Sequence, residues 1–390
     1  MRKGMKTVLL SVLLACIFAM SGCTKAEDVK NPAVETGKQD EQKEEDTKET
    51  ETPSGDTTEK KEIDIVFLEG TDGNSWRTQC ENAMQAVADQ YLADGTIAKY
   101  KLMVANNDAT TQIQQMEQAI LDGVDLILIN PVTTTGLSAT IDKAIDQGIL
   151  VMSLDQHITH PDVISVTNDQ YKWAKIQVEW FVEAIGKKGN IYRMDAIKGA
   201  PASDIREQAF VDVLSNYPEI KVIAQDYGYW DEGKGKQIMT QWIATEPNFD
   251  GILCQDGLAV GILEAIEEAG LPYPKAITSD EYIQYLKKWK GINDANPDKP
   301  LNAIIVENPP SIGVLAMKIG VRLLNGEELK EEALVTDPID PENKNAVLYD
   351  PTVVITLDNI DEYYEKYKDA PDSAYIDTEM TDELVDKYFK

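Results

Sequence analysis

Side chains that can bind hydroxyl groups recur along this chain at the points where short apolar runs end. Carboxylates and amides are planar, so one such group can hold two neighbouring hydroxyls through paired hydrogen bonds. An indole ring offers a flat apolar face that packs against the C–H face of a sugar ring. This mixture predicts a site for a polyol. The residues concerned are Asn74, Trp76, Asn130, Asp155, Gln156, Arg206, Trp230, Asp256, Asp280 and Glu307.

Signals for catalysis or cofactor chemistry are weak by comparison. The sequence has no GxSxG nucleophile motif, no phosphate-binding P-loop and no GxGxxG after a predicted strand. His157 and His160 are the only histidines and lie in a polar loop, which argues against a metal site. We therefore expect a binding protein without metal or cofactor. A hydrolase that uses Asp155 and Asp280 as its two carboxylates is the open alternative.

Alternating strands and helices position these residues. Short apolar runs alternate with helical periods over residues 63–153 and again over residues 173–324. Repeated βα units predict a parallel sheet with helices on both faces, and two series predict two sheets. The expected fold class is therefore α/β, with two doubly wound parallel-sheet domains. The carboxyl ends of the strands would then form the ligand-binding edges.

The individual elements follow from the hydrophobic pattern. Strands are expected at 63–68, 100–104, 126–129, 149–153, 163–166, 190–194, 221–224, 251–254, 276–278, 302–306, 346–349 and 353–356. Helices are expected near 76–91, 113–121, 135–147, 173–185, 202–216, 234–244, 259–269 and 312–324.

The N-terminal region indicates where the protein works. A basic leader precedes a 13-residue apolar run that ends at Met20, which is too short to span a bilayer and is typical of an export signal. The following Ser21-Gly22-Cys23 resembles a bacterial lipobox, in which Cys23 becomes the lipidated N-terminus. Residues 24–61 lack aromatic residues, Leu, Ile and Met, and this composition predicts a disordered acidic tether. A plain secretion signal is the alternative.

The net charge limits which partners are expected, and the cysteine content limits which disulfides can form. The formal net charge is −31, and most of it falls after the tether. A body this acidic is repelled by phosphate backbones, so nucleic acid is excluded as a partner. Cys80 and Cys254 remain in the folded body and are expected to be buried core residues, although a disulfide between them stays open in an exported protein.

Several short motifs, taken in their order along the chain, resemble one family. With the lipoprotein leader, they make the chain similar to the type I periplasmic solute-binding proteins, especially the ribose- and galactose-binding group that serves ABC importers. The resemblance covers about residues 62–357. The motifs are Asn74-Ser75-Trp76, Ile129-Asn130-Pro131, Leu154-Asp155, Arg206-Glu207-Gln208-Ala209-Phe210, Cys254-Gln255-Asp256, Thr278-Ser279-Asp280 and the pair Glu307 with Gly313.

The resemblance implies a ligand cleft between the two domains. Arg206 would be the only cation near it, and Gln156 stands where the family often has a second arginine. The expected cleft is therefore more acidic than that of a plain pentose or hexose binder, which leaves an amine-bearing or nucleoside-like ligand open. Asn74, Trp76, Asp155 and Gln156 would line the N-terminal half with support from Asn130, and Arg206, Trp230, Asp256, Asp280 and Glu307 would complete the polar ring.

The resemblance also implies a function and a domain organisation. The protein would be a lipid-anchored extracytoplasmic monomer that captures a small sugar or polyol by hinge closure and delivers it to an ABC importer permease. A sensor feeding a membrane signalling partner is the alternative. Three crossings between the domains are expected, near 166–169, 307–310 and 350–353. The expected parts are a signal peptide (1–22), a tether (23–61), an N-terminal subdomain (62–167 with 309–350), a C-terminal subdomain (168–308 with 351–357) and an outer acidic helical tail (358–390).

Overall fold

The computed structural model describes residues 62–71, 73–279 and 281–390. The expected signal peptide, the lipidation candidate Cys23, the tether and the site candidate Asp280 therefore lie outside the described residues. Among the helices of the described part, none is both long enough and apolar enough to cross a membrane.

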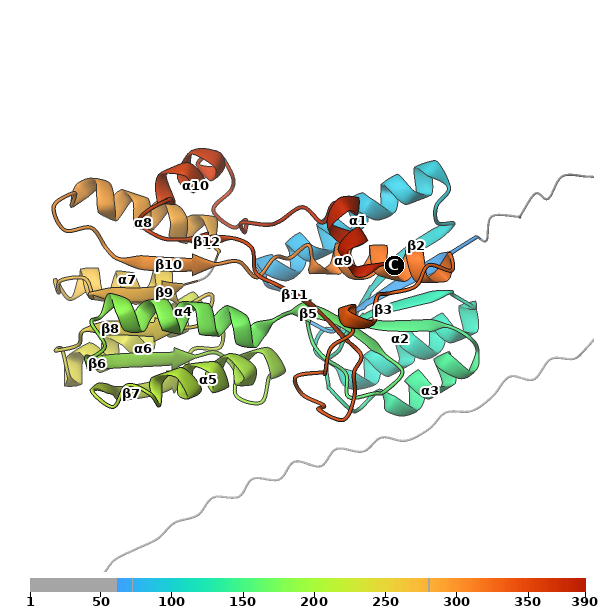
Figure 1. Ribbon diagram of the computed structural model, residues 1–390, viewed down its shortest axis with the longest axis horizontal. Coiled ribbons are helices and arrows are strands. Elements are labelled where there is room, and N and C mark those ends of the chain that lie inside the picture. The colour runs from blue at the N-terminus through green and yellow to red at the C-terminus, as the bar shows by residue number, and fades with distance from the viewer. Residues whose placement is uncertain (1–61, 72, 280) are drawn as a thin grey trace, which may run out of the picture. The chain divides into compact units, whose positions relative to one another are not determined.

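Two parallel sheets form the framework of the described residues (Figure 1). The first sheet has the strand order β11-β5-β4-β3-β1-β2 and the second has the order β12-β10-β9-β8-β6-β7. Neighbouring strands run parallel, apart from β12, which pairs antiparallel with β10. The predicted α/β fold class with two parallel-sheet domains is confirmed. We call these domains the N-terminal lobe and the C-terminal lobe.

The strands and helices have the following bounds. The N-terminal lobe contains β1 (Asp64–Glu69), α1 (Ser75–Asp94), β2 (Lys99–Val104), α2 (Ala109–Asp122), β3 (Leu126–Asn130), α3 (Ser138–Asp146), β4 (Leu150–Leu154), β5 (Ile164–Asn168), α9 (Ile312–Leu324), the short 3-10 helix η1 (Glu331–Ala333) and β11 (Ala346–Tyr349). The C-terminal lobe contains α4 (Gln170–Ala184), β6 (Gly189–Asp195), α5 (Pro201–Leu214), β7 (Ile220–Tyr227), α6 (Glu232–Thr245), β8 (Gly251–Cys254), α7 (Ala259–Glu268), β9 (Ala276–Ser279), α8 (Ile283–Ala295), β10 (Ala303–Val306) and β12 (Val354–Ile355). The C-terminal tail contains α10 (Ile360–Tyr367), α11 (Asp382–Val385) and η2 (Asp386–Tyr388).

Helices cover both faces of each sheet because successive strand residues point to opposite sides. In β1, Ile65 and Phe67 pack with α1 and α9, whereas Val66 and Leu68 pack with α2 and α3. The C-terminal lobe repeats this arrangement, with α4 and α5 on one face and α6, α7 and α8 on the other. Strands buried on both faces explain the almost unbroken apolar runs in the sequence.

Helix α8 differs from the expectation, which has no helix between the strands at 276–278 and 302–306. Its signal is present in the sequence, because Ile283, Leu286, Trp289 and Ile292 recur every three residues and are all buried. Lysines and a glycine fill most of the positions between these apolar residues, as expected for a helix with one buried face.

The C-terminal tail is expected to lie on the outside of the body, but part of it belongs to the hydrophobic cores. Ile360 and Ile376 belong to the core of the C-terminal lobe, but Met380, Val385 and Phe389 belong to the core of the N-terminal lobe. The chain passes between the lobes after β5, after β10 and after β11, and the tail adds a fourth connection after Ile376.

The two cysteines of the body are both buried, and neither forms a disulfide. Cys80 belongs to the core of the N-terminal lobe and Cys254 to the core of the C-terminal lobe. The disulfide that the sequence left open is therefore absent from this structure.

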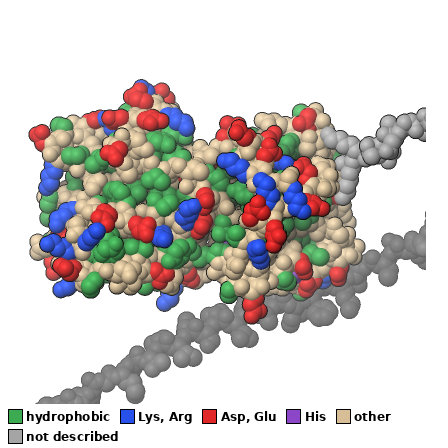
Figure 2. Space-filling model, in the orientation of Figure 1, with side chains coloured by type: hydrophobic (Ala, Val, Ile, Leu, Met, Phe, Trp, Pro, Cys, Tyr) green, Lys and Arg blue, Asp and Glu red, His purple; other side chains and the backbone are tan. Residues whose placement is uncertain are grey.

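Acidic and basic side chains are interspersed over the face shown in Figure 2. Many of them are paired at the surface. Arg322, for example, lies 2.6 Å from both Glu327 and Asp386, while its own side chain is 24% exposed. Such exposed pairs contribute little to stability, because water screens the attraction.

Candidate functional site

A cavity lies where the carboxyl ends of strands from both lobes meet. It holds about 540 Å³ of space, including the part that is open to solvent. Seven of the predicted residues line it: Asn74, Trp76, Asp155, Gln156, Arg206, Trp230 and Asp256. The other lining residues are Arg77, Ala202, Gly257, Tyr282, Asn308 and Tyr375.

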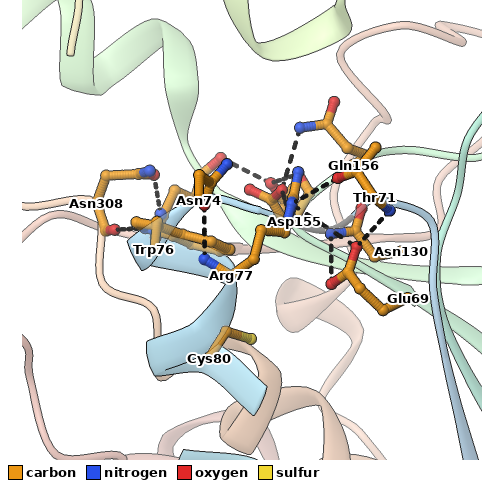
Figure 3. A network of polar contacts seen from close by, with 12 residues as sticks. Glu69, Thr71, Asn74, Trp76, Arg77, Cys80, Asn130, Asp155, Gln156 and Asn308 are labelled. Carbon is orange, nitrogen blue, oxygen red and sulfur yellow. Dashed lines mark hydrogen bonds and ion pairs between the residues drawn. The ribbon is translucent and has the colours of Figure 1, made fainter. Parts of the chain in front are cut away.

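The start of α1 supplies part of the N-terminal lobe's side of the cavity, beside Asp155 and Gln156 (Figure 3). Asn74 caps this helix, because its Oδ1 accepts a hydrogen bond from the Arg77 backbone N at 2.8 Å. Asn74 thus has the structural role of a cap and also lines the cavity. The cap fixes the direction in which Trp76 and Arg77 leave the helix.

Arg77 forms an ion pair with Asp155, which follows β4. The Arg77 Nη1 lies 2.6 Å from the Asp155 Oδ2, and Gln156 donates from Nε2 to the same oxygen at 3.1 Å. Asp155 is only 7% exposed, so its charge needs this partner. The expectation that Arg206 is the only cation near the cleft is therefore wrong.

A third ionisable group, Glu69, lies beneath this pair at the end of β1. It is fully buried, and its Oε1 lies 3.7 Å from the Arg77 Nε. Burial raises the pKa of Glu69 from 4.5 to about 7, against the opposing effect of Arg77. Burial alone would lower the pKa of Arg77, but the carboxylates of Glu69 and Asp155 raise it above its ordinary value. The guanidinium therefore stays charged.

The C-terminal lobe carries a second arginine–aspartate pair, between Arg206 on α5 and Asp256 after β8. Arg206 is 1% exposed, and its guanidinium stacks 4.0 Å from the centre of the Trp173 ring. Its Nε donates to the Gln170 Oε1 at 2.7 Å. Burial raises the pKa of Asp256, and the charge of Arg206 opposes that rise.

Two indoles contribute to the walls of the cavity. The Trp76 Nε1 donates to the Asn308 carbonyl at 2.8 Å. The Trp230 Nε1 is buried and finds no hydrogen-bond partner among the described residues. Trp230 is held against Gly257, where an added Cβ would lie 2.8 Å from the Trp230 carbonyl oxygen, so this close approach requires glycine.

Glu307 does not lie in the polar ring of the cavity, where the sequence predicts it. It is fully buried among the crossing segments, where its Oε1 accepts hydrogen bonds from the Tyr349 hydroxyl at 3.0 Å and the Val353 backbone N at 2.9 Å. The Thr352 backbone N and hydroxyl donate to the same oxygen, and the Thr378 hydroxyl donates to Oε2. These partners use both carboxylate oxygens, so Glu307 holds the connections together and does not line the cavity.

Asn130 also lies outside the cavity lining. It is 1% exposed, and its Nδ2 donates to the Glu69 Oε2 at 3.3 Å. The register of the sheet explains this contact, because Glu69 and Asn130 are paired residues on β1 and β3. Asn130 therefore acts on the site through Glu69 and Arg77.

Four polar or aromatic lining residues were not predicted from the sequence: Arg77, Tyr282, Asn308 and Tyr375. Arg77 directly follows Trp76 at a predicted helix start, so its position carried a usable signal. Asn308 directly follows Glu307 and Tyr282 follows Asp280 by two residues, so both were near predicted sites. Tyr375 lies in the tail, where no strand end precedes it, and the sequence offered no signal for it.

Comparisons with known proteins point to one family. A family model described as a periplasmic binding protein domain matches residues 65–328. The chain is 32% identical over 224 residues to the galactofuranose-binding protein of Escherichia coli, which covers 55% of this chain and 69% of that protein. It is 31% identical over 169 residues to the xylitol-binding protein of Mycolicibacterium smegmatis, covering 43% of this chain but only about half (48%) of that protein.

Solved structures show the same fold. The ABC transporter solute binding protein of Thermobispora bispora superimposes with a TM-score of 0.70 at 26% identity, covering 84% of this chain and 94% of that chain. A solute binding protein of Bacillus halodurans with bound myo-inositol superimposes with a TM-score of 0.64 at 20% identity, covering 80% of this chain and all of that chain (100%).

Proposed function

Since this chain belongs to the periplasmic binding protein family, and the relatives named above include a galactofuranose-binding protein, a xylitol-binding protein and an ABC transporter solute binding protein, we propose that its cavity captures a small neutral sugar or polyol for an ABC-type importer. The ligand would enter between the lobes, and contacts from both lobes would favour a closed state. An importer would then recognise the closed surface.

One observation carries this proposal: two arginine–aspartate pairs and two indoles face a single cavity. Each pair presents donors and acceptors side by side, which suits the neighbouring hydroxyls of a polyol. The indoles suit the apolar face of a ring. The buried Trp230 Nε1 supports the proposal, because a ligand oxygen would relieve the cost of an unpaired donor, about 1–3 kcal/mol.

The charge balance favours a neutral ligand over an amine. Asp155 is paired with Arg77, and Asp256 is paired with Arg206, so the described residues of the cavity lining, which do not include Asp280, carry as many arginines as aspartates. An ammonium group bound there would have to compete with a guanidinium for each carboxylate. The amine-bearing ligand that the sequence left open therefore becomes the weaker choice.

A ligand screen tests the proposal. The purified mature protein would be melted in the presence of D-ribose, D-galactose, xylitol, myo-inositol, glucosamine and adenosine. A ligand at 100 times its dissociation constant should add about 2.7 kcal/mol of stability. Asp155→Asn should abolish most of this shift for the ligand that binds. The proposal fails if none of the four neutral sugars and polyols stabilises the parent, or if glucosamine alone does.

We propose further that Cys23 carries a lipid anchor on the extracytoplasmic side of the membrane. The support is the lipobox-like sequence before Cys23 and the polar composition of residues 24–61. Cys23→Ser should release the protein from the membrane fraction into the soluble fraction. Unchanged membrane retention of this variant would contradict the anchor.

A further inference from the structure

The fourth connection between the lobes passes directly beside the cavity. It is made by residues 371–378, which we call the strap, and it lies outside residues 65–328 that the family model matches. Ile376 of the strap is fully buried in the core of the C-terminal lobe, while Tyr375 belongs to the core of the N-terminal lobe. The strap therefore joins the two lobes within two consecutive residues.

Backbone hydrogen bonds attach the strap to the C-terminal lobe. Tyr375 forms an antiparallel bridge with Tyr282, which precedes α8. The Ile283 backbone N donates to the Ala374 carbonyl at 3.0 Å, and the Ile376 backbone N donates to the Glu281 carbonyl at 2.9 Å. The strap thus extends the C-terminal lobe by one short strand-like segment.

Side chains of the N-terminal lobe hold the other side of the strap. Gln79 on α1 pairs with both backbone groups of Tyr375: its Oε1 accepts from the Tyr375 N at 2.9 Å, and its Nε2 donates to the Tyr375 carbonyl at 3.3 Å. Ser311, which precedes α9, donates from its hydroxyl to the Asp377 Oδ2 at 2.7 Å. Tyr375 is therefore fixed by both lobes at once.

The ring of Tyr375 forms part of the cavity lining. It packs against the Tyr282 ring with a centroid distance of 4.1 Å, and both rings line the cavity. The Ser75 hydroxyl lies 3.1 Å from the Tyr282 hydroxyl and 3.4 Å from the Tyr375 hydroxyl. These three hydroxyls come from the N-terminal lobe, the C-terminal lobe and the strap, so the position of the two tyrosines in the wall depends on contacts among all three parts.

We propose that the strap is part of the ligand site, with Tyr375 as a specificity-determining residue that limits the size of the ligand and ties the lobes together. This inference rests on the proposed function. A rigid tyrosine ring in the wall favours a sugar that packs against it and excludes a substituent that would need its space. The attachment to both lobes restricts how far they separate when the cavity is empty.

The first test compares Tyr375→Ala and Tyr375→Phe with Tyr388→Ala, a half-buried tail tyrosine that is absent from the cavity lining. The probes are D-galactose, D-ribose and xylitol, each with its O-methyl derivative, measured by calorimetry. Tyr375→Ala should lower the affinity for the sugar that the parent binds best about tenfold. The same variant should raise the affinity for the O-methyl derivative of that sugar relative to the affinity for the sugar itself. Tyr375→Phe should stay within about threefold of the parent, because it keeps the ring. Unchanged affinity and preference in Tyr375→Ala would overturn the proposal, as would an equal loss in Tyr388→Ala.

A second test needs no ligand, so it remains informative if no probe binds and the proposed function fails. Dyes on Leu121→Cys in α2 and Val211→Cys in α5 would report the distance between the lobes by single-molecule fluorescence transfer, since both positions are exposed. Cys80 and Cys254 are buried, and burial raises the pKa of the Cys80 thiol, so neither competes for the dye. Tyr375→Ala combined with Asp377→Ala should lengthen and broaden the distance distribution. An unchanged distribution would overturn the strap's role.

Discussion

Replacing Arg77 by Gln should destabilise the unliganded protein more than a typical surface charge does. The Arg77 guanidinium lies 2.6 Å from Asp155 and 3.7 Å from Glu69, and these carboxylates are 7% and 0% exposed. At an effective dielectric constant of about 20, the attraction is about 6 kcal/mol to Asp155 and about 4 kcal/mol to Glu69 when Glu69 is ionised. The cost of burying the charges offsets part of this attraction. Removing one partner of a buried pair typically costs about 3–5 kcal/mol, and we expect a loss in that range.

Urea unfolding followed by tryptophan fluorescence measures this loss. Arg322→Gln is the matched control, because Arg322 also pairs with two carboxylates but is 24% exposed. It should cost at most about 1 kcal/mol. Combining Arg77→Gln with Asp155→Asn should recover part of the lost stability, because the buried Asp155 charge no longer lacks a partner. If Arg77→Gln costs no more stability than Arg322→Gln, the buried Arg77–Asp155 pair does not stabilise the protein. The argument that paired charges organise the cavity is then refuted.

Three further predictions concern the walls, the buried acid and the connections. Trp76→Ala and Trp230→Ala should each lower the affinity for the sugar about tenfold, whereas Trp180→Ala on α4 should leave it unchanged. An equal loss of affinity in all three variants would show that Trp76 and Trp230 act through stability of the fold and do not contact the ligand. The folded pKa of Glu69 (about 7) lies above its ordinary 4.5, so its favourable contribution is complete below pH 4.5 and is lost as pH rises to about 7. As the pH rises from 4.5 to about 8, the free energy of unfolding of Glu69→Gln, measured in urea, should therefore increase by about 3 kcal/mol relative to that of the parent. A difference that does not change with pH would contradict the raised pKa of Glu69. Glu307→Gln should lower the free energy of unfolding by about 1.5–3 kcal/mol and change sugar affinity little, whereas a loss of affinity at unchanged stability would return Glu307 to the cavity.

The fold was predictable because its signals are local. Buried parallel strands leave apolar runs, amphipathic helices leave a period near 3.6, and both patterns depend only on neighbouring residues. Parallel strands also end at one edge of the sheet, so the positions after them could be predicted as site residues. Trp76, Asp155 and Asp256 were found in this way, and the structure places them around one cavity.

The sequence by itself determined the two parallel-sheet lobes and most of the residue types in the cavity. The tertiary structure alone decided which charges pair and which segments reach the site. Arg77 meets Asp155 across 78 residues of chain, the oxygens of Glu307 point into the connections, and Tyr375 returns from the tail to the cavity. The physical reason is that periodicity depends on near neighbours, whereas the partner of a buried polar group is set by packing between segments far apart in sequence.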